Sequence, residues 1–270
     1  MLLVLRAVGA MLGRIAFWIG IRRTVTTQNL DRAFPDYSEH RRRSIAARSY
    51  SNLGRVFFEF LFLRYARNEK VRAGLDIVNI EEFLPLIQAS QGAILLSGHL
   101  ANWEWLALGC ALRVGQPLDV IIKNQRSTIA ERFLVAMRSR FGNRMLDAGN
   151  VRAIYRALRN RELLAILGDQ TASPEDVRVP FFGRDVPTFE GTARLALATR
   201  APILFLQPFE ITSQGYRCRF MQVPFDDLTE TTAESVRELT ARHTNVLEDA
   251  IREKPEFWLW QHRRWKHAKE

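Results

Sequence analysis

The sequence predicts an α/β fold, with a mixed, largely parallel central sheet that is flanked by helices and preceded by an N-terminal amphipathic, membrane-associated helical extension. Short apolar runs alternate with helical patterns, which is typical of parallel sheets whose crossovers are helices. The chain has 270 residues, of which 47% are hydrophobic, so it can bury the core of one such domain. The expected strands are residues 93–97, 120–123, 163–167, 178–181, 203–208 and 216–221. The expected helices lie near residues 103–113, 127–141, 150–160, 189–199 and 232–253.

We expect residues 1–67 to form a membrane-associated helical region that packs onto an α/β domain of residues 68–270 as one unit. From Ser38 to about Arg67 the apolar residues follow a helical period, and Ser38 is a suitable N-cap. Residues 57–63 are apolar on nearly every side. This composition suits burial against both the core and lipid, although core packing alone would also explain it.

Residues 1–21 carry only two charged side chains, Arg6 and Arg14. As a helix they would be roughly 31 Å long, which is enough to cross a bilayer. On a helical wheel Gly9 and Gly13 lie on the same side as the arginines, and the large apolar side chains lie on the other. An arginine at mid-bilayer costs about 2.5–3.5 kcal/mol, so a helix in the membrane interface is favoured over a span. A soluble amphipathic helix that covers the core is the alternative.

The chain is strongly basic, with a formal net charge of +10, and only five of its 39 basic residues are lysines. Arginine suits phosphate and carboxylate binding, although a GC-rich genome would give the same bias. No helix-turn-helix, zinc-finger or RNA-binding signature accompanies the basic runs, so nucleic acid is not the expected partner. A membrane surface or an acidic carrier protein fits this charge better.

Several enzyme classes are excluded because their motifs are missing. The sequence has no G-x-S-x-G nucleophile elbow, no Walker phosphate loop, no dinucleotide-binding G-x-G-x-x-G and no H-E-x-x-H zinc pair. Cys110 and Cys218 show no metal or redox spacing. We therefore expect both cysteines to be core residues of a protein from a reducing compartment.

The segment with the most chemical content runs from Gly98 through His99 to Glu104, between an expected strand and a helix that begins near Trp103. Residues five apart on an ideal helix diverge by roughly 140°, so the two side chains meet only if His99 lies in the turn and Glu104 in the first helical turn. The pair would then be a general base and its orienting acid. A chance spacing within a packed turn is the alternative.

A second turn follows the apolar run of residues 163–167 and carries Asp169. In a parallel sheet this position places Asp169 on the same edge as His99, the edge where α/β proteins build active sites. A turn-capping aspartate is the alternative interpretation. Arg138 and Arg140, on the preceding expected helix, are either solvated charges or contacts to a phosphorylated or carboxylate-bearing substrate.

Two further basic segments indicate a membrane. Arg22 and Arg23, directly after the apolar N-terminal run, would face the cytoplasm by the charge-bias rule, and no small-residue cleavage site of a signal peptide follows the run. Residues 258–266 interleave indole rings with cationic side chains. This composition is typical of the membrane interface, where both groups lie at headgroup depth. A stacked cluster on the protein surface is the alternative.

Taken together, these segments resemble the bacterial lipid A late acyltransferases, within a wider superfamily that carries an H-x4-D/E motif. The resemblance runs from about residue 21 to residue 266, and the order and separation of its motifs make it specific. The motifs are residues 29–35, the turn 98–104, Arg138 with Phe141 and Gly142, Asp169 with Gln170, residues 179–183, residues 195–202, and the closing segment 258–266.

The resemblance implies transfer of a fatty acyl chain from an acyl carrier protein thioester to a hydroxyl of a lipid A precursor. It implies that His99 deprotonates the hydroxyl and that Glu104 orients and charges His99. No metal or cofactor is required, because the thioester is already activated and the hydroxyl needs only deprotonation. The candidate substrate-binding residues are Arg138, Asp169, Gln170, Asn102 and Arg140.

The resemblance also implies an enzyme at the cytoplasmic face of the inner membrane, either peripheral or held by one N-terminal anchor, and we expect it to be a monomer. Two alternatives stay open. The acceptor could be another glycolipid, such as a phosphatidylinositol mannoside, with acyl-CoA as the donor. A non-catalytic protein that binds a membrane surface or nucleic acid through its basic face would need neither His99 nor Glu104 for its function.

Overall fold

The computed structural model describes residues 1–89, 92–122, 128–139 and 142–268. Its seven-stranded sheet has the order β1-β9-β8-β2-β5-β3-β4. Strands β8 and β9 pair antiparallel and the other described neighbours pair parallel, which confirms the mixed, largely parallel sheet. The strands are β1 (Leu75–Ile77), β2 (Ala93–Ser97), β3 (Leu118–Ile122), β4 (Arg144–Asp147), β5 (Leu163–Leu167), β8 (Ile203–Ile211) and β9 (Tyr216–Val223).

The sequence pattern does not predict the two edge strands or the partner of residues 178–181. Strands β1 and β4 are only three and four residues long, too short to show an alternation of apolar and polar residues. The expected strand β6 (Arg178–Phe181) pairs with β7 (Arg184–Pro187) in a separate antiparallel hairpin, and the helix expected near residues 189–199 follows it and begins at Gly191. Phe182 and Gly183 form the turn, both with the positive φ that a tight hairpin requires.

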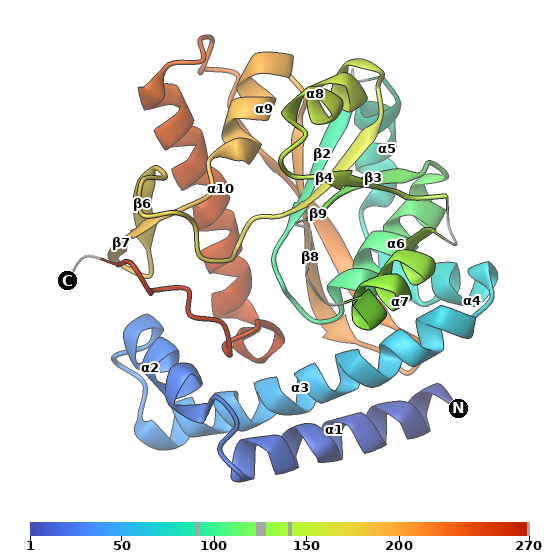
Figure 1. The fold of residues 1–270 in the computed structure, drawn as a ribbon, viewed down its shortest axis with the longest axis vertical. Helices are drawn as coiled ribbons and strands as arrows, with labels where there is room; N and C mark the ends of the chain where they lie inside the picture. Colours follow the sequence, from blue (N-terminus) through green and yellow to red (C-terminus); the bar gives the residue numbers. More distant parts are fainter. Residues whose placement is uncertain (90–91, 123–127, 140–141, 269–270) are drawn as a thin grey trace.

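Helices lie on both sides of the sheet, with α9 and α10 to its left and α5, α6 and α7 to its right in Figure 1. The helices expected from periodicity all form, whereas α2, α4 and α5 are additional. Ser38 caps α3 as expected, because its side chain accepts the backbone N–H of Arg41. The helices are α1 (Leu2–Trp18), α2 (Arg23–Ala33), α3 (Glu39–Tyr65), α4 (Asn68–Ala73), α5 (Ile80–Ala89), α6 (Trp103–Val114), α7 (Thr128–Ser139), α8 (Val151–Arg159), α9 (Gly191–Thr199) and α10 (Ala233–Glu253).

Strand β2 lies at the centre of the sheet, and residues 93–96 are all buried because both faces are covered. It pairs with β5 on one side and β8 on the other. Ser97, the last residue of β2, lies opposite Leu167, the last residue of β5. The segments that leave these two strands therefore begin side by side at the carboxyl edge of the sheet, as the sequence predicts.

Helices α1 and α3 run side by side across one end of the molecule, at the bottom of Figure 1. Small residues allow the close approach: a Cβ added at Gly9 would collide with the backbone of Gly54, and one at Gly13 with the backbone of Tyr50. Arg6, Gly9 and Gly13 are buried in this contact, so the side of the helical wheel that carries them faces the protein. A glycine contact of this kind is common between helices at or in membranes.

The apolar side of α1 faces outward. A soluble amphipathic helix would turn this side toward the core, and α1 does the opposite. Among the described helices none alone is long and apolar enough to cross a bilayer; only α1 with α2, bent by 89° at the break between them, reaches that length and composition. The exposed apolar side chains include Leu3, Val4, Met11, Leu12, Ile15 and Trp18 of α1, with Phe57 and Leu61 of α3.

The tryptophans of the C-terminal segment are not at a surface, and the prediction that they lie at a membrane interface is wrong. Trp258, Trp260 and Trp265 are at most 4% exposed, so the alternative of a surface cluster is wrong too. Their rings pack against one another and against Phe181. The composition resembles that of a membrane belt, but the indoles are buried by the β6–β7 hairpin and the end of the sheet, which local composition cannot reveal.

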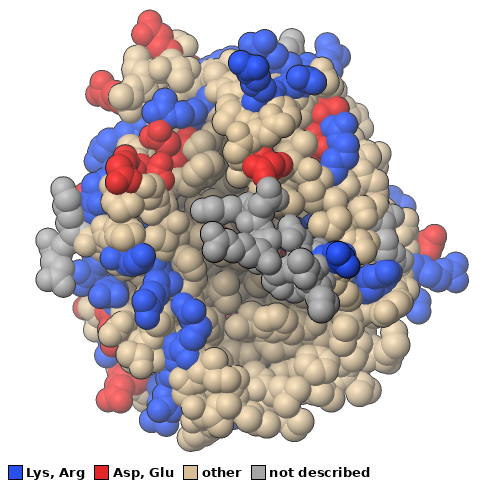
Figure 2. Space-filling model, in the orientation of Figure 1, with Lys and Arg blue, Asp and Glu red and all other residues tan. Residues whose placement is uncertain are grey.

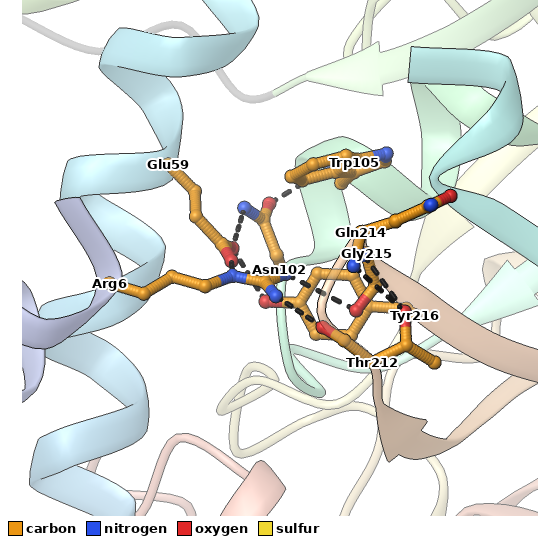
Figure 3. A network of polar contacts seen from close by, with 8 residues as sticks. All are labelled: Arg6, Glu59, Asn102, Trp105, Thr212, Gln214, Gly215 and Tyr216. Atoms are coloured by element: carbon orange, nitrogen blue, oxygen red, sulfur yellow. Dashed lines mark hydrogen bonds and ion pairs between the residues drawn. The ribbon is translucent and has the colours of Figure 1, made fainter. Parts of the chain in front are cut away.

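A buried ion pair joins α1 to the body of the protein (Figure 3). The guanidinium of Arg6 pairs with the carboxylate of Glu59 on α3, whose side chain is 0% exposed. The same guanidinium donates to the carbonyl oxygens of Thr212 and Gly215, in the loop between β8 and β9. Arg6 is therefore a cation buried inside the protein.

The other oxygen of Glu59 reaches the start of α6. It accepts a hydrogen bond from Asn102 Nδ2 at 2.7 Å and one from the hydroxyl of Tyr216 at 2.5 Å. Asn102 Oδ1 in turn accepts the backbone N–H of Trp105 and so caps α6. The N-terminal helices and the turn that contains His99 are thus held by one polar network, drawn in Figure 3.

Replacement of Arg6 tests this network. Arg6→Met leaves the charge of Glu59 buried without its cation, so we expect it to lower the free energy of unfolding by about 3–5 kcal/mol. Arg14 is exposed on the same helix and forms no ion pair among the described residues. Arg14→Met should therefore change stability by less than about 0.5 kcal/mol. Urea unfolding in detergent measures both variants.

The double variant Arg6→Met, Glu59→Gln removes both charges and should recover part of the loss, because no uncompensated charge is left buried. Equal stability of Arg6→Met and Arg14→Met, or a double variant less stable than Arg6→Met alone, would contradict the network.

Candidate active site

The turn after β2 brings His99 to the carboxyl edge of the sheet. Gly98 begins the turn, and an added Cβ there would lie 2.8 Å from Leu247 Cδ1 and 3.1 Å from Asp169 Oδ2. Only glycine lets the chain pass this close to the carboxylate. Ala101 has a φ of 47°, in the left-handed region that side chains rarely adopt. A turn this constrained needs contacts that hold it from outside.

The C-terminal segment supplies those contacts. The backbone N–H of Ala101 donates to the carbonyl of Phe257, and that of Leu259 donates to the carbonyl of His99. Leu100 forms an isolated antiparallel bridge with Trp258. The C-terminal tail, residues 257–266, therefore holds the His99 turn in place. No signal in the local sequence indicates this role.

His99 and Asp169 form the central pair of the site. Nδ1 of His99 lies 2.7 Å from Oδ1 of Asp169. Oδ2 of the same carboxylate accepts the backbone N–H of His99 at 2.7 Å and the indole N–H of Trp258 at 2.8 Å. Because Nδ1 donates to the carboxylate, Nε2 is left as the basic nitrogen. The predicted placement of Asp169 beside His99 is confirmed.

The electrostatics of the pair favour a strong base. Burial disfavours the imidazolium, but the charge and hydrogen bond of Asp169, helped by the charge of Glu104, raise the pKa of His99 above its ordinary value. Burial would raise the pKa of Asp169, yet His99 and the indole of Trp258 lower it well below the usual range. Asp169 is therefore a fixed negative charge beside the imidazole.

Glu104 differs from its expected position. It lies in the first turn of α6, as predicted, but its carboxylate binds Arg138 of α7 in a two-point contact, with Arg138 Nε 2.8 Å from Glu104 Oε2. The spacing suggests that Glu104 accepts a hydrogen bond from His99, but Asp169 accepts it instead. The five-residue spacing brings Glu104 close enough to act on His99 through its charge, but the helix aims the carboxylate toward α7.

The other candidate residues take different positions. Gln170 Nε2 lies 3.1 Å from Nε2 of His99, the ring nitrogen that does not contact Asp169. Asn102 is 0% exposed and uses its side chain to cap α6 and to bind Glu59, so it does not face the site. Arg140 lies outside the described residues.

An apolar cavity of about 80 Å³ opens beside this site, between α6 and the sheet. Trp103, Glu104 and Arg138 lie at the end near His99, since the ring of Trp103 is 4.9 Å from that of His99. The remaining lining is almost entirely aliphatic. It comprises Leu95, Leu96, Ser97, Leu106, Ala107, Cys110, Leu118, Val120, Ile121, Ala165, Ile166, Leu167 and Leu206.

Neither cysteine is suited to covalent chemistry. Burial raises the pKa of the Cys110 thiol to about 12 and that of Cys218 well above its usual value, so both stay neutral. Both are buried, as the sequence predicts. Within the described parts of the chain, no three or more His, Cys, Asp or Glu side chains gather in a way that could hold a metal ion.

The surroundings divide into an apolar and a basic side. Figure 2 shows a hollow in the middle of the face, with uncharged atoms below it over α3 and α1. Lysine and arginine side chains run along the left of the hollow, over α2 and the C-terminal tail. A ligand with both apolar chains and negative charges matches this division.

Several known proteins are similar to this chain in sequence. It is 24% identical over 271 residues to lipid A biosynthesis lauroyltransferase of Escherichia coli K12, an alignment that covers 97% of this chain and 85% of that protein. It is 24% identical over 273 residues to lipid A biosynthesis palmitoleoyltransferase of the same organism, with the same coverage. Phosphatidylinositol mannoside acyltransferase of Mycobacterium tuberculosis is 24% identical over 200 residues, covering 72% of this chain and 62% of that protein.

The family model of bacterial lipid A biosynthesis acyltransferases matches residues 3–267. An acyltransferase requires an acyl donor and, in this family, a lipid acceptor, which agrees with an apolar cavity and a basic histidine at one site. The chain is therefore a member of the bacterial lipid A biosynthesis acyltransferase family, and it is an acyltransferase that transfers groups other than aminoacyl groups.

Proposed function

We propose that this protein transfers a fatty acyl chain from an acyl carrier protein thioester to a hydroxyl of a lipid A precursor, at the cytoplasmic face of the inner membrane. The observation that carries the proposal is the His99–Asp169 pair at the carboxyl edge of the sheet, beside an apolar cavity. A base with a fixed tautomer activates a hydroxyl, and the aliphatic lining of the cavity suits the hydrocarbon part of an acyl chain.

His99 acts as the general base. Nε2 takes the proton of the acceptor hydroxyl while the oxygen attacks the thioester carbonyl and forms a tetrahedral intermediate. The intermediate collapses to the new ester, the carbon–sulfur bond breaks, and His99 returns the proton to the leaving thiolate. Asp169 stays ionised throughout and stabilises the imidazolium that forms. Gln170 Nε2 occupies the hydrogen-bonding position at Nε2 that the hydroxyl takes over when it binds.

Glu104 and Arg138 line the end of the cavity near His99. Their ion pair is largely buried, with side-chain exposures of 4% and 17%, and it joins α6 to α7. Nε and Nη2 of Arg138 are used on Glu104, and Nη1 has no partner among the residues the structure describes. This nitrogen is a donor for the thioester carbonyl as negative charge develops there.

The acceptor reaches the site along a membrane surface. The outward apolar side of α1, with Phe57 and Leu61 of α3, suits an interfacial position in which the acceptor's chains stay in the bilayer. The net charge of +10 suits both an acidic carrier protein and phosphorylated lipids.

A second acceptor is favoured by the similarity to phosphatidylinositol mannoside acyltransferases. With such a glycolipid and acyl-CoA as donor, the same base and cavity would serve without change. A lipid profile of a deletion strain decides between the two acceptors. The non-catalytic alternative predicts that substitution of His99 leaves the phenotype intact.

The function is tested with the purified protein, an acyl carrier protein thioester and a lipid A precursor. We expect mass spectrometry to show the precursor gaining one acyl chain. His99→Ala should lower the rate by about 10²- to 10⁴-fold, because the general base is lost. Arg159→Ala, an exposed position on α8, is the control and should keep full activity. An active His99→Ala protein would rule out this mechanism.

The pH dependence of kcat/KM separates the roles of the two carboxylates. His99 must be neutral to accept a proton, so the rate should rise with pH through a pKa above the ordinary value of about 6.5. Asp169→Asn removes the main charge that raises this pKa, so the inflection should move to lower pH. Glu104→Gln should move it much less, since Glu104 contributes less and its charge is paired with Arg138. The reverse order of shifts would contradict the assignment of Asp169.

Cys110 tests whether the cavity holds the acyl chain. It lies six residues along α6 from Glu104 and lines the cavity away from His99. Cys110→Phe should fill the deep end and shift the preferred donor to a shorter chain, measured by competition between acyl thioesters of different length. Cys110→Ser keeps the volume and should keep the preference. An unchanged preference in a folded Cys110→Phe protein would place the acyl chain elsewhere.

A further inference from the structure

A second hollow, of about 360 Å³, lies between α2 and the C-terminal tail, apart from the apolar cavity. We call it the basic cleft. Its charged lining consists of Arg32 on α2 with Arg263 and Lys266 on the tail, and none of its lining residues is a carboxylate. Figure 2 shows the basic side chains of these two segments along the left of the central hollow. Three cations that share one cleft repel each other unless an anion lies between them.

The three cations are available for a ligand. None of them forms an ion pair with a carboxylate among the described residues, whereas exposed arginines elsewhere do, such as Arg217 with Asp76. No carboxylate of the described residues therefore neutralises their charges. An anion that enters the cleft meets no competing carboxylate in its lining.

A buried donor in the lining points the same way. Trp265 lines the cleft and is 4% exposed, and its indole N–H has no hydrogen-bond acceptor. An indole N–H can only donate, and a buried donor without an acceptor costs stability. The cleft thus places three cations beside a buried donor that has no acceptor, and what it lacks is an acceptor with negative charge. A phosphate group supplies several acceptor oxygens and the charge.

The cleft is connected to the site of His99. The backbone N–H of Thr171, the residue after Gln170, donates to Nε2 of His262 at 2.9 Å. The hydroxyl of Thr171 lies 2.9 Å from the same nitrogen. The hydroxyl of Thr171 also donates to the carbonyl of Arg263. Hydrogen bonds therefore join the segment that carries Gln170 to the tail segment that carries Arg263 of the cleft lining.

The place of α2 identifies the source of the phosphate. This helix follows α1 directly, and the exposed apolar side of α1 is the part of the protein that suits a bilayer surface. A cleft formed by α2 then lies at the depth of lipid headgroups. We propose that the basic cleft binds a phosphate ester on the headgroup of the acceptor lipid through Arg32, Arg263 and Lys266, which orients the acceptor hydroxyl toward His99. This proposal rests on the proposed acyl transfer to a glycolipid.

Phosphate binding is measured without catalysis, so that it stands apart from the proposed function. Calorimetry with inorganic phosphate and the full chain should show binding that the double variant Arg32→Ala, Lys266→Ala weakens at least about tenfold. Arg159→Ala removes an exposed cation far from the cleft and should bind like the unchanged protein. Equal affinity of the double variant, or no binding by the unchanged protein, overturns the cleft as a phosphate site.

Kinetics identify the molecule that carries the phosphate. With a phosphorylated acceptor the double variant should raise the KM for the acceptor about tenfold or more and leave the KM for the donor unchanged. With the same lipid after removal of its phosphate, the double variant and the unchanged protein should have equal rates. A rise confined to the KM for the donor would assign the cleft to the phosphate of the donor's pantetheine arm and overturn the lipid assignment. Phosphate binding without acyl transfer by the unchanged protein would instead refute the proposed function alone.

Discussion

The carboxylate of Asp169 is the group on which the arrangement of the site depends. It is buried, and it accepts hydrogen bonds from the imidazole of His99, from the backbone of His99 and from the indole of Trp258. These donors come from the turn after β2 and from the C-terminal tail, so one charge fixes the ring, its turn and the tail together. The same charge raises the pKa of His99. A buried carboxylate needs hydrogen-bond donors for both of its oxygens. The donors that Asp169 binds are the groups that hold the His99 turn and set the pKa of His99.

The N-terminal layer is tied to the same turn from the opposite side. Glu59 holds Arg6 of α1 and Asn102 of α6, so the helix that presents an apolar side outward is joined by charge to the helix that follows His99. In our account, the bilayer surface, the apolar cavity and the basic side of the molecule meet around His99. A lipid with apolar chains, a hydroxyl and a phosphate would then have one place for each part.

The sequence predicts the strands at the centre of the sheet and the long helices, because long periodic runs dominate local preference. It also places His99 and Asp169 on one edge, since both follow apolar strands of one parallel sheet. It cannot show which carboxylate the imidazole binds: Glu104 is nearer in the chain, but its helix turns it toward Arg138. The sequence also cannot show where the tail lies, because interleaved indole and guanidinium groups occur both at membrane interfaces and in buried clusters. The cavity lining, drawn from six separate elements, has no sequence signature.

The central claim is that Asp169, and not Glu104, holds the Nδ1 proton of His99. NMR of the protein with ¹⁵N-labelled histidine rings tests it directly, since a ring proton shared with a buried carboxylate resonates far downfield and exchanges slowly. The account predicts such a proton on Nδ1 of His99, retained in Glu104→Gln and shifted strongly upfield or lost in Asp169→Asn. A downfield proton that survives in Asp169→Asn and disappears in Glu104→Gln would contradict the account.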